Sequence, residues 1–146
     1  MLERSINRLV YLVETAPILL MEIPEQDFSF KADPAKWSKK EIIGHLIDSA
    51  TNNHHRLVRG QFEQIPEIQY DQDKWRQFSY YQHIESSQII SFWTIYNKQL
   101  IEIIKRIPKA SLSKQVKIGN DLYSLEQLIV DYVNHLEHHL RQVIKY

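Results

Sequence analysis

Apolar residues recur every three or four positions in four long segments of this chain, which is the spacing of an amphipathic helix. The four predicted helices cover about residues 2–21, 39–60, 87–106 and 125–146. The chain has only three glycines and five prolines, and most of them fall between these segments. Pro17, inside the first segment, is expected to kink or break that helix. The pattern predicts an all-α protein, arranged as an up-down four-helix bundle.

Two of the predicted helices begin with the pattern of a capping box. Ser38-Lys39-Lys40-Glu41 and Ser124-Leu125-Glu126-Gln127 each place a serine three residues before a glutamate or glutamine. The serine accepts a hydrogen bond from a first-turn amide, and the longer side chain reaches back to the backbone of the cap. Gly60 is expected to end the second helix.

The connections between the helices differ in character. Residues 61–85, between the second and third helices, form a long predicted loop without sustained periodicity. A loop of this length is often a lid or a binding loop, and the alternative is an aromatic-rich connection that packs across two helices. Residues 24–34 are also predicted to be a loop. Residues 115–122 alternate weakly around Gly119-Asn120-Asp121 and could form a short hairpin.

Length, charge and cysteine content narrow the class of protein. The 146 residues suit a single domain spanning positions 1–146. Lysine plus arginine and aspartate plus glutamate both number 18, which argues against nucleic acid as the main partner. No apolar stretch is long enough for a membrane span. The chain has no cysteine, so any metal must be held by histidine, carboxylate or water, and a cytoplasmic location is expected.

Three of the seven histidines lie within five residues near the C-terminus. His135 and His139 are four positions apart, so on a helix they lie one turn apart on the same side. This spacing lets two imidazoles bind one metal ion. At about 100° per residue, His139 borders the apolar face and His135 flanks it, whereas His138 points toward solvent. The first two are therefore the candidate ligands.

A third candidate ligand, His45, lies at the flank of the apolar face of the second helix. Ser49, Asn52 and Arg56 follow on the same stripe, each about one turn apart. Three neutral imidazoles with one open position are the ligand set of a catalytic zinc site, and imidazole also suits nickel, copper and iron. The alternative is that the histidines are hydrogen-bonded structural residues and that the stripe is a solvated helix flank.

Two segments resemble motifs of the DinB/YfiT-like superfamily of four-helix-bundle metalloproteins. They run from Trp37 to Ser49 and from His135 to Gln142, and their order and separation fit the family over essentially the whole chain. In that family, one histidine of the second helix and an H-x-x-x-H pair of the last helix bind a divalent metal, often nickel or zinc. The resemblance implies that His45, His135 and His139 are the ligands. Many members carry Arg-Gly-Gln after the double histidine, a pattern from which this chain departs.

The resemblance also implies an enzymatic activity. Some characterised members transfer a low-molecular-weight thiol to an electrophile, and others are described as metal-dependent hydrolases. A thiol transferase would activate the thiol of a small-molecule substrate at the metal, and Arg56 and Asn52 could hold a carboxylate or the developing charge. A hydrolase would need a general base, for which Asp131, one turn before His135, is the candidate unless it is an ordinary surface acid.

A third alternative is a non-catalytic bundle whose metal is structural and which acts through association with other proteins. A homodimer through a helix face is compatible with the pattern, although the sequence does not indicate which face would be used.

Overall fold

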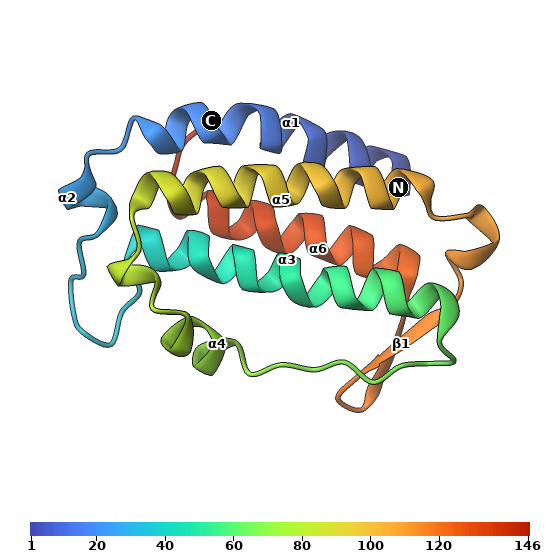
Figure 1. Ribbon diagram of the computed structural model, residues 1–146. Helices are drawn as coiled ribbons and strands as arrows, with labels where there is room; N and C mark the ends of the chain where they lie inside the picture. Colours follow the sequence, from blue (N-terminus) through green and yellow to red (C-terminus); the bar gives the residue numbers. More distant parts are fainter.

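The computed structural model describes residues 1–146, and four long helices dominate it (Figure 1). They are α1 (Leu2–Met21), α3 (Lys39–Phe62), α5 (Ser86–Arg106) and α6 (Leu125–Leu140). The connections contain α2 (Glu25–Phe28), α4 (Gln72–Ser79), the 3-10 turns η1 (Tyr81–His83) and η2 (Lys109–Ser111), and the strands β1 (Gln115–Ile118) and β2 (Asp121–Ser124). The predicted all-α four-helix bundle is confirmed, because each periodic segment forms one of the long helices.

The order of the helices differs from the simple up-down alternation that the sequence pattern predicts. Helices α1 and α3 each pack mainly against α5 and α6, so α1 and α3 lie diagonally across the bundle. Figure 1 shows α3 and α5 running in one direction and α1 and α6 running in the other. Apolar periodicity identifies the buried face of a helix but not the helix that covers it, so the pattern alone cannot give this order.

Because α3 and α5 are parallel, the chain must travel back along the bundle between them. Helix α3 has 24 residues and is about 36 Å long at 1.5 Å per residue. Residues 63–85 make this return along α3 and include α4 and η1 (Figure 1). Residues 66–68 also pair with β1 through backbone hydrogen bonds of 2.9 and 3.0 Å to Lys117. The predicted loop at 61–85 is therefore a return connection that contains helical turns.

Glycine and proline interrupt the helices less than the sequence predicts. Helix α3 does not end at Gly60 but continues to Phe62. A Cβ atom at Gly60 would lie 2.6 Å from Cδ2 of Leu125, so this glycine serves the close approach of α3 to the start of α6. Pro17 lies inside α1, which is assigned as one continuous helix on both sides of it.

Two chain segments near helix ends also differ from the predictions. The last helix ends at Leu140 rather than near Tyr146, and the chain then turns so that Val143 and Ile144 are buried. The predicted loop at 24–34 contains the short helix α2, whose last residue is buried in the core.

The predicted caps and the hairpin are present. Ser38 accepts a hydrogen bond of 3.1 Å from the backbone N–H of Glu41, and the Glu41 carboxylate accepts one of 3.2 Å from Ser38 N–H. Ser124 and Gln127 make the corresponding pair at 3.1 and 2.9 Å. Strands β1 and β2 are antiparallel, and Gly119 in their turn has a φ of 61°, which favours glycine.

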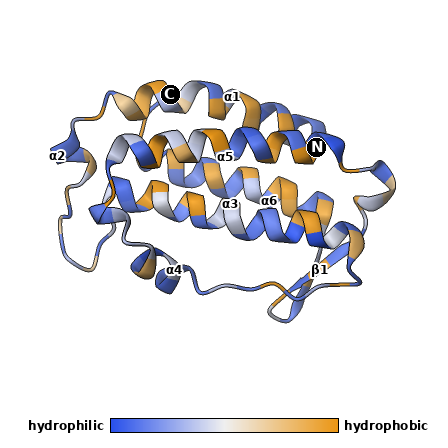
Figure 2. Cartoon of the chain, viewed as in Figure 1, coloured by the Kyte–Doolittle hydropathy of each residue, from blue (hydrophilic) through white to orange (hydrophobic).

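The bundle core is mostly apolar, and most of its buried polar side chains lie on α3. Figure 2 shows apolar residues recurring at helical intervals along the long helices, with hydrophilic residues between them. No helix combines the length and the apolar character needed to cross a bilayer. Helix α3 is exceptional because it buries a stripe of polar side chains, namely His45, Asp48, Ser49, Asn52, Asn53 and Arg56. Buried polar groups cost free energy unless they find partners, so this stripe marks the region where function is expected.

Candidate metal centre

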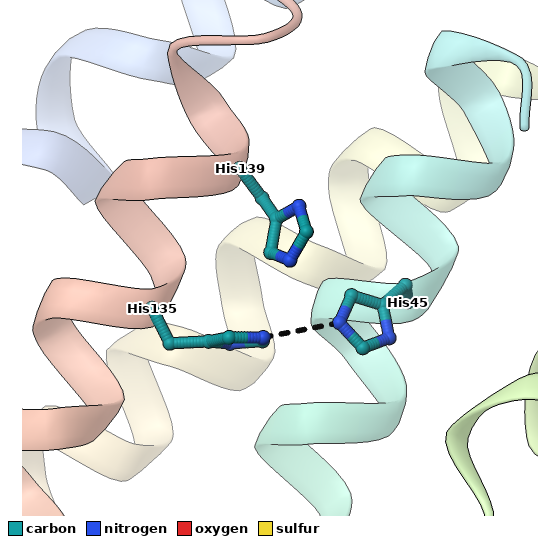
Figure 3. Close-up of side chains that lie close together, drawn as sticks. All are labelled: His45, His135 and His139. Carbon is teal, nitrogen blue, oxygen red and sulfur yellow. Dashed lines mark hydrogen bonds between the residues drawn. The ribbon is translucent and has the colours of Figure 1, made fainter.

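Three histidine side chains converge between α3 and α6 (Figure 3). His45 projects from α3, and His135 and His139 project from neighbouring turns of α6. The Nε2 atoms of His45 and His135 are 3.1 Å apart, and one ring nitrogen from each histidine lies within 4.8 Å of those of the other two. The structure thus brings the three residues predicted from the sequence to one point.

Local structure determines where the three rings lie. A spacing of four residues places His135 and His139 one turn apart on the same side of α6. Leu136 and Leu140, each one position further along, are fully buried and fix the rotation of α6 about its axis. His45 is only 1% exposed, which fixes it at the interface between α3 and α6.

Burial keeps two of these rings neutral. It lowers the pKa of His45 to about 3, and the neighbouring His135, His139 and Arg76 act in the same direction. Burial also lowers the pKa of His135 to about 4, with further contributions from His139 and His138. Both imidazoles are therefore uncharged at neutral pH, which is the form that binds a metal.

Side chains around the histidines help to orient their rings. His139 Nδ1 lies 3.0 Å from Gln142 Oε1, and an amide oxygen only accepts, so Nδ1 carries the hydrogen and Nε2 keeps its lone pair. A partner of this kind fixes the tautomer of a metal-binding histidine. The ring of Trp37 lies 5.1 Å from that of His45, and the Arg76 guanidinium lies 5.0 Å above the Trp37 ring.

The donor set suits a divalent ion. Nitrogen ligands about 2.0–2.1 Å from a tetrahedral zinc lie about 3.3 Å from one another, close to the separation of 3.1 Å between His45 and His135. His45 Nδ1 is buried without a hydrogen-bond partner, so the only polar contact of this ring is with another candidate ligand. Three imidazoles fit zinc and nickel alike, so the ligands indicate a divalent metal without fixing which one.

The three polar residues predicted beside the metal site have different surroundings. Arg56 is buried and lines a cavity of about 220 Å³, of which His135 also forms part of the wall. Asp131 lines the same cavity but is exposed, as expected for a residue at its rim. Asn52 is buried but does not line the cavity, and its amide donates to the backbone oxygen of Asp48 at 2.9 Å.

The cavity contains residues that sequence reasoning did not select. Asn53, next to Asn52, lines the wall with Ser49, and its amide donates to the Ser49 backbone oxygen at 2.9 Å. Both asparagines lie about one turn from Ser49, so helical spacing alone could not separate them. Tyr70 comes from the return connection and Tyr123 from β2, and nothing in their local sequence places either beside α3.

Asp48, three residues beyond His45 on α3, is a further residue that sequence reasoning did not select. Helical projection turns it away from the polar stripe, yet it is 2% exposed and accepts a hydrogen bond of 2.5 Å from the Tyr81 hydroxyl. Its other carboxylate oxygen has no partner. Burial raises the pKa of Asp48 to about 6, although the hydrogen bond from Tyr81 and the charge of Arg76 oppose this rise. The return connection covers this side of α3, which is why Asp48 is buried.

Fold and site together define a four-helix-bundle protein with a three-histidine site of metal-binding type. The chain belongs to the DinB superfamily, whose sequence profile matches residues 1–143. It is similar in structure to YfiT from Bacillus subtilis, which is described as a probable metal-dependent hydrolase with an unusual four-helix bundle topology.

The similarity to YfiT has a TM-score of 0.87 at 16% sequence identity and covers 97% of this chain and 83% of YfiT. At this level of identity the likeness establishes the fold. No protein of curated function matches the chain significantly.

Proposed function

We propose that this protein is a divalent-metal-dependent hydrolase that acts on a small molecule. The observation that carries the proposal is that a candidate ligand, His135, forms part of the wall of a cavity lined by polar side chains. A structural metal site needs no such cavity, because its ligands surround the ion completely. The name given to YfiT supports the same reaction class.

A zinc or nickel ion held by His45, His135 and His139 would supply Lewis-acid chemistry and lower the pKa of a water molecule or a thiol at its open position. All three ligands are neutral when they bind, so they leave the positive charge of the ion undiminished. His135 lines the cavity, so a substrate bound there would lie beside one of the residues that would hold the ion.

Asp131 is the candidate general base. It lies four residues before His135 on α6 and lines the same cavity, so both side chains face one space. A carboxylate that lines the cavity is placed to take a proton from an attacking water. Removing this base is expected to lower the rate of hydrolysis by a factor of about 10² to 10⁴.

Thiol transfer is the second candidate, and the exposure of Asp131 favours it. A thiol that binds a metal ion loses its proton without the help of a general base. The reaction therefore does not depend on an acid that lies at the rim of the cavity. The assignment stays a prediction until a thiol substrate is tested.

The test uses protein purified without an affinity tag. Elemental analysis of wild type, His135→Ala and His138→Ala measures bound metal, and the exposed His138 is a matched control on the same helix. We expect about one metal per chain in wild type and His138→Ala, and little in His135→Ala. The loaded protein is then assayed on small esters and amides without thiol, and on small thiols with an electrophile.

Turnover of esters or amides without thiol supports the hydrolase. Consumption of thiol only when electrophile and metal are both present supports the transferase instead. Metal binding with neither reaction, together with a large rise in melting temperature, would reassign the ion to a structural role. Absence of metal from wild type would remove the basis of all three proposals.

A further inference from the structure

Arg56 is a buried cation without an anionic partner. The residue is 8% exposed, and none of the seven ion pairs of the structure includes it. Burying an unpaired charge is costly, so a buried cation is normally matched by a carboxylate. The interior of this bundle provides no such partner for Arg56.

The hydrogen bonds of Arg56 hold its guanidinium without neutralising it. Nε donates to the backbone oxygen of Ile68 at 3.2 Å, and Nη1 lies 3.5 Å from the amide oxygen of Asn53. The guanidinium lies 5.7 Å above the Tyr70 ring. Burial lowers the pKa of Arg56, and the ionisable neighbours that oppose this shift are Tyr70 and Tyr123 rather than carboxylates. The two hydrogen bonds use Nε and Nη1, so Nη2 has no hydrogen-bond partner in the protein.

The cavity joins Arg56 to the candidate metal centre. Arg56, Tyr70, Tyr123 and His135 all line it, and Asp131, from the turn of α6 before His135, lines it as well. Its volume of about 220 Å³ is below the roughly 300–1,000 Å³ of sites for drug-sized ligands. The space therefore suits a group about as large as an amino acid.

We propose that Arg56 binds the carboxylate of a small substrate in this cavity and so places the reacting bond of that substrate beside His135. A guanidinium offers two parallel N–H donors that match the two oxygens of a carboxylate. The single charge of a carboxylate balances the single charge of Arg56, and no second Lys or Arg side chain lines the cavity to balance a phosphate dianion there. Asp131 repels the anionic end of the substrate and thus favours one orientation.

This inference rests on the proposed function for the identity of the reaction, but the binding of a carboxylate at Arg56 can be measured without activity. The probe is propionate, with propionamide as a neutral molecule of the same shape. NMR spectra of the Arg56 Nε–H group, assigned by its absence in Arg56→Gln, are recorded during titration at constant ionic strength. Protein is used both as purified and after removal of metal.

We expect propionate to shift the Arg56 signal in a saturable way in both forms of the protein. Propionamide should bind at least about tenfold more weakly, because it lacks the negative charge and the second acceptor oxygen that pair with a guanidinium. Arg56→Gln should weaken propionate binding to the same extent, and Arg56→Lys should weaken it less. Signals of Tyr70 and Tyr123 report binding in the variants.

Arg59→Gln is the matched control. Arg59 lies three residues further along α3, is paired with Glu63 at 2.6 Å and lies outside the cavity. Its variant should bind propionate like wild type. Equal loss in both variants, or equal binding of propionate and propionamide, would overturn the proposal. An equal or stronger response to inorganic phosphate would overturn the choice of carboxylate.

Two outcomes separate this inference from the proposed function. Propionate binding in a protein that binds no metal keeps the carboxylate site and removes the metal-dependent reaction. One metal per chain without any response of Arg56 to propionate keeps the metal centre and removes the carboxylate site. If Arg56→Gln fails to fold, the comparison of propionate with propionamide in wild type still decides the question.

Discussion

The Tyr81 hydroxyl donates a hydrogen bond of 2.5 Å to the carboxylate of Asp48, one turn of α3 beyond His45. This contact joins the return connection to the helix that carries a candidate metal ligand. It satisfies one oxygen of Asp48 and leaves the other buried without a partner. Burial of a carboxyl group in this position favours its protonated form and raises its pKa, which has a measurable consequence for stability.

The stability of the protein should depend on the ionisation of Asp48. Its pKa rises from 3.8 to about 6 on folding, so the folded state binds more protons than the unfolded state between these values. The free energy of unfolding therefore falls as the pH rises from about 4 to about 6 through this group. Asp48→Asn keeps an acceptor for Tyr81 and should be more stable than wild type at pH 8 by roughly 3 kcal/mol.

Urea unfolding of the metal-free proteins measures this difference. It should shrink toward zero as the pH falls to about 3, below the unfolded-state pKa of 3.8, where Asp48 is protonated in both states. Asp121→Asn removes an exposed carboxylate from β2 and serves as the control, with little change expected at either pH. If Asp48→Asn were no more stable than wild type at pH 8, the ionised Asp48 would have a partner that stabilises it.

Added zinc or nickel should stabilise the folded protein only when all three ligands are present. At a free metal concentration about a hundred times the dissociation constant, binding adds about 2.7 kcal/mol to the free energy of unfolding. Thermal unfolding with and without metal should show this gain in wild type and in His138→Ala, and little of it in His139→Ala. A similar gain in all three proteins would place the metal elsewhere.

Gly44→Ala should destabilise the protein through a clash with Tyr81. A Cβ atom at Gly44 would lie 2.2 Å from Cδ2 of the Tyr81 ring, far inside van der Waals contact. Overpacking of this kind costs about 1–3 kcal/mol. The measurement is a double-mutant cycle with Tyr81→Ala, in which Gly44→Ala should cost much less once the ring is absent. Additive effects would show that the clash is relieved by movement elsewhere.

The cap of α6 should contribute to stability without contributing to metal binding. Ser124→Ala removes the side chain that accepts from Gln127 N–H, and loss of such a cap costs about 1 kcal/mol. Ser124→Asp keeps an acceptor and should restore most of the loss. Denaturant unfolding gives the stability, and elemental analysis of the same samples should give unchanged metal content. Loss of metal in Ser124→Ala would mean that the start of α6 positions the histidines.

The features that the sequence predicts correctly all depend on short-range spacing. The four helices, both capping boxes and the common side of His135 and His139 follow from residues that lie within a few turns of one another. His45 was selected because it flanks the apolar face of a helix, and that face must pack against another helix. The structure places His45 against His135 for that reason.

The features that the sequence misses depend on which segments become neighbours. Asp48 is buried because Tyr81 packs on α3 through the space left at Gly44, a contact between residues more than 30 positions apart. Tyr70 reaches the cavity for a similar reason. The diagonal placement of α1 and α3 is likewise a property of the assembled bundle, and no local pattern distinguishes it from simple alternation.

Because α3 and α5 are parallel, the candidate site is built from two kinds of structure, core helices and the long connection between α3 and α5. The three histidines lie on helices whose positions are fixed by the core. Tyr70, which lines the cavity, and Arg76, which lies over the Trp37 ring, belong instead to the connection. Connections tolerate substitution and insertion far better than core helices do. Changes in the connection can therefore reshape the cavity wall while the three histidines keep their positions on the core helices.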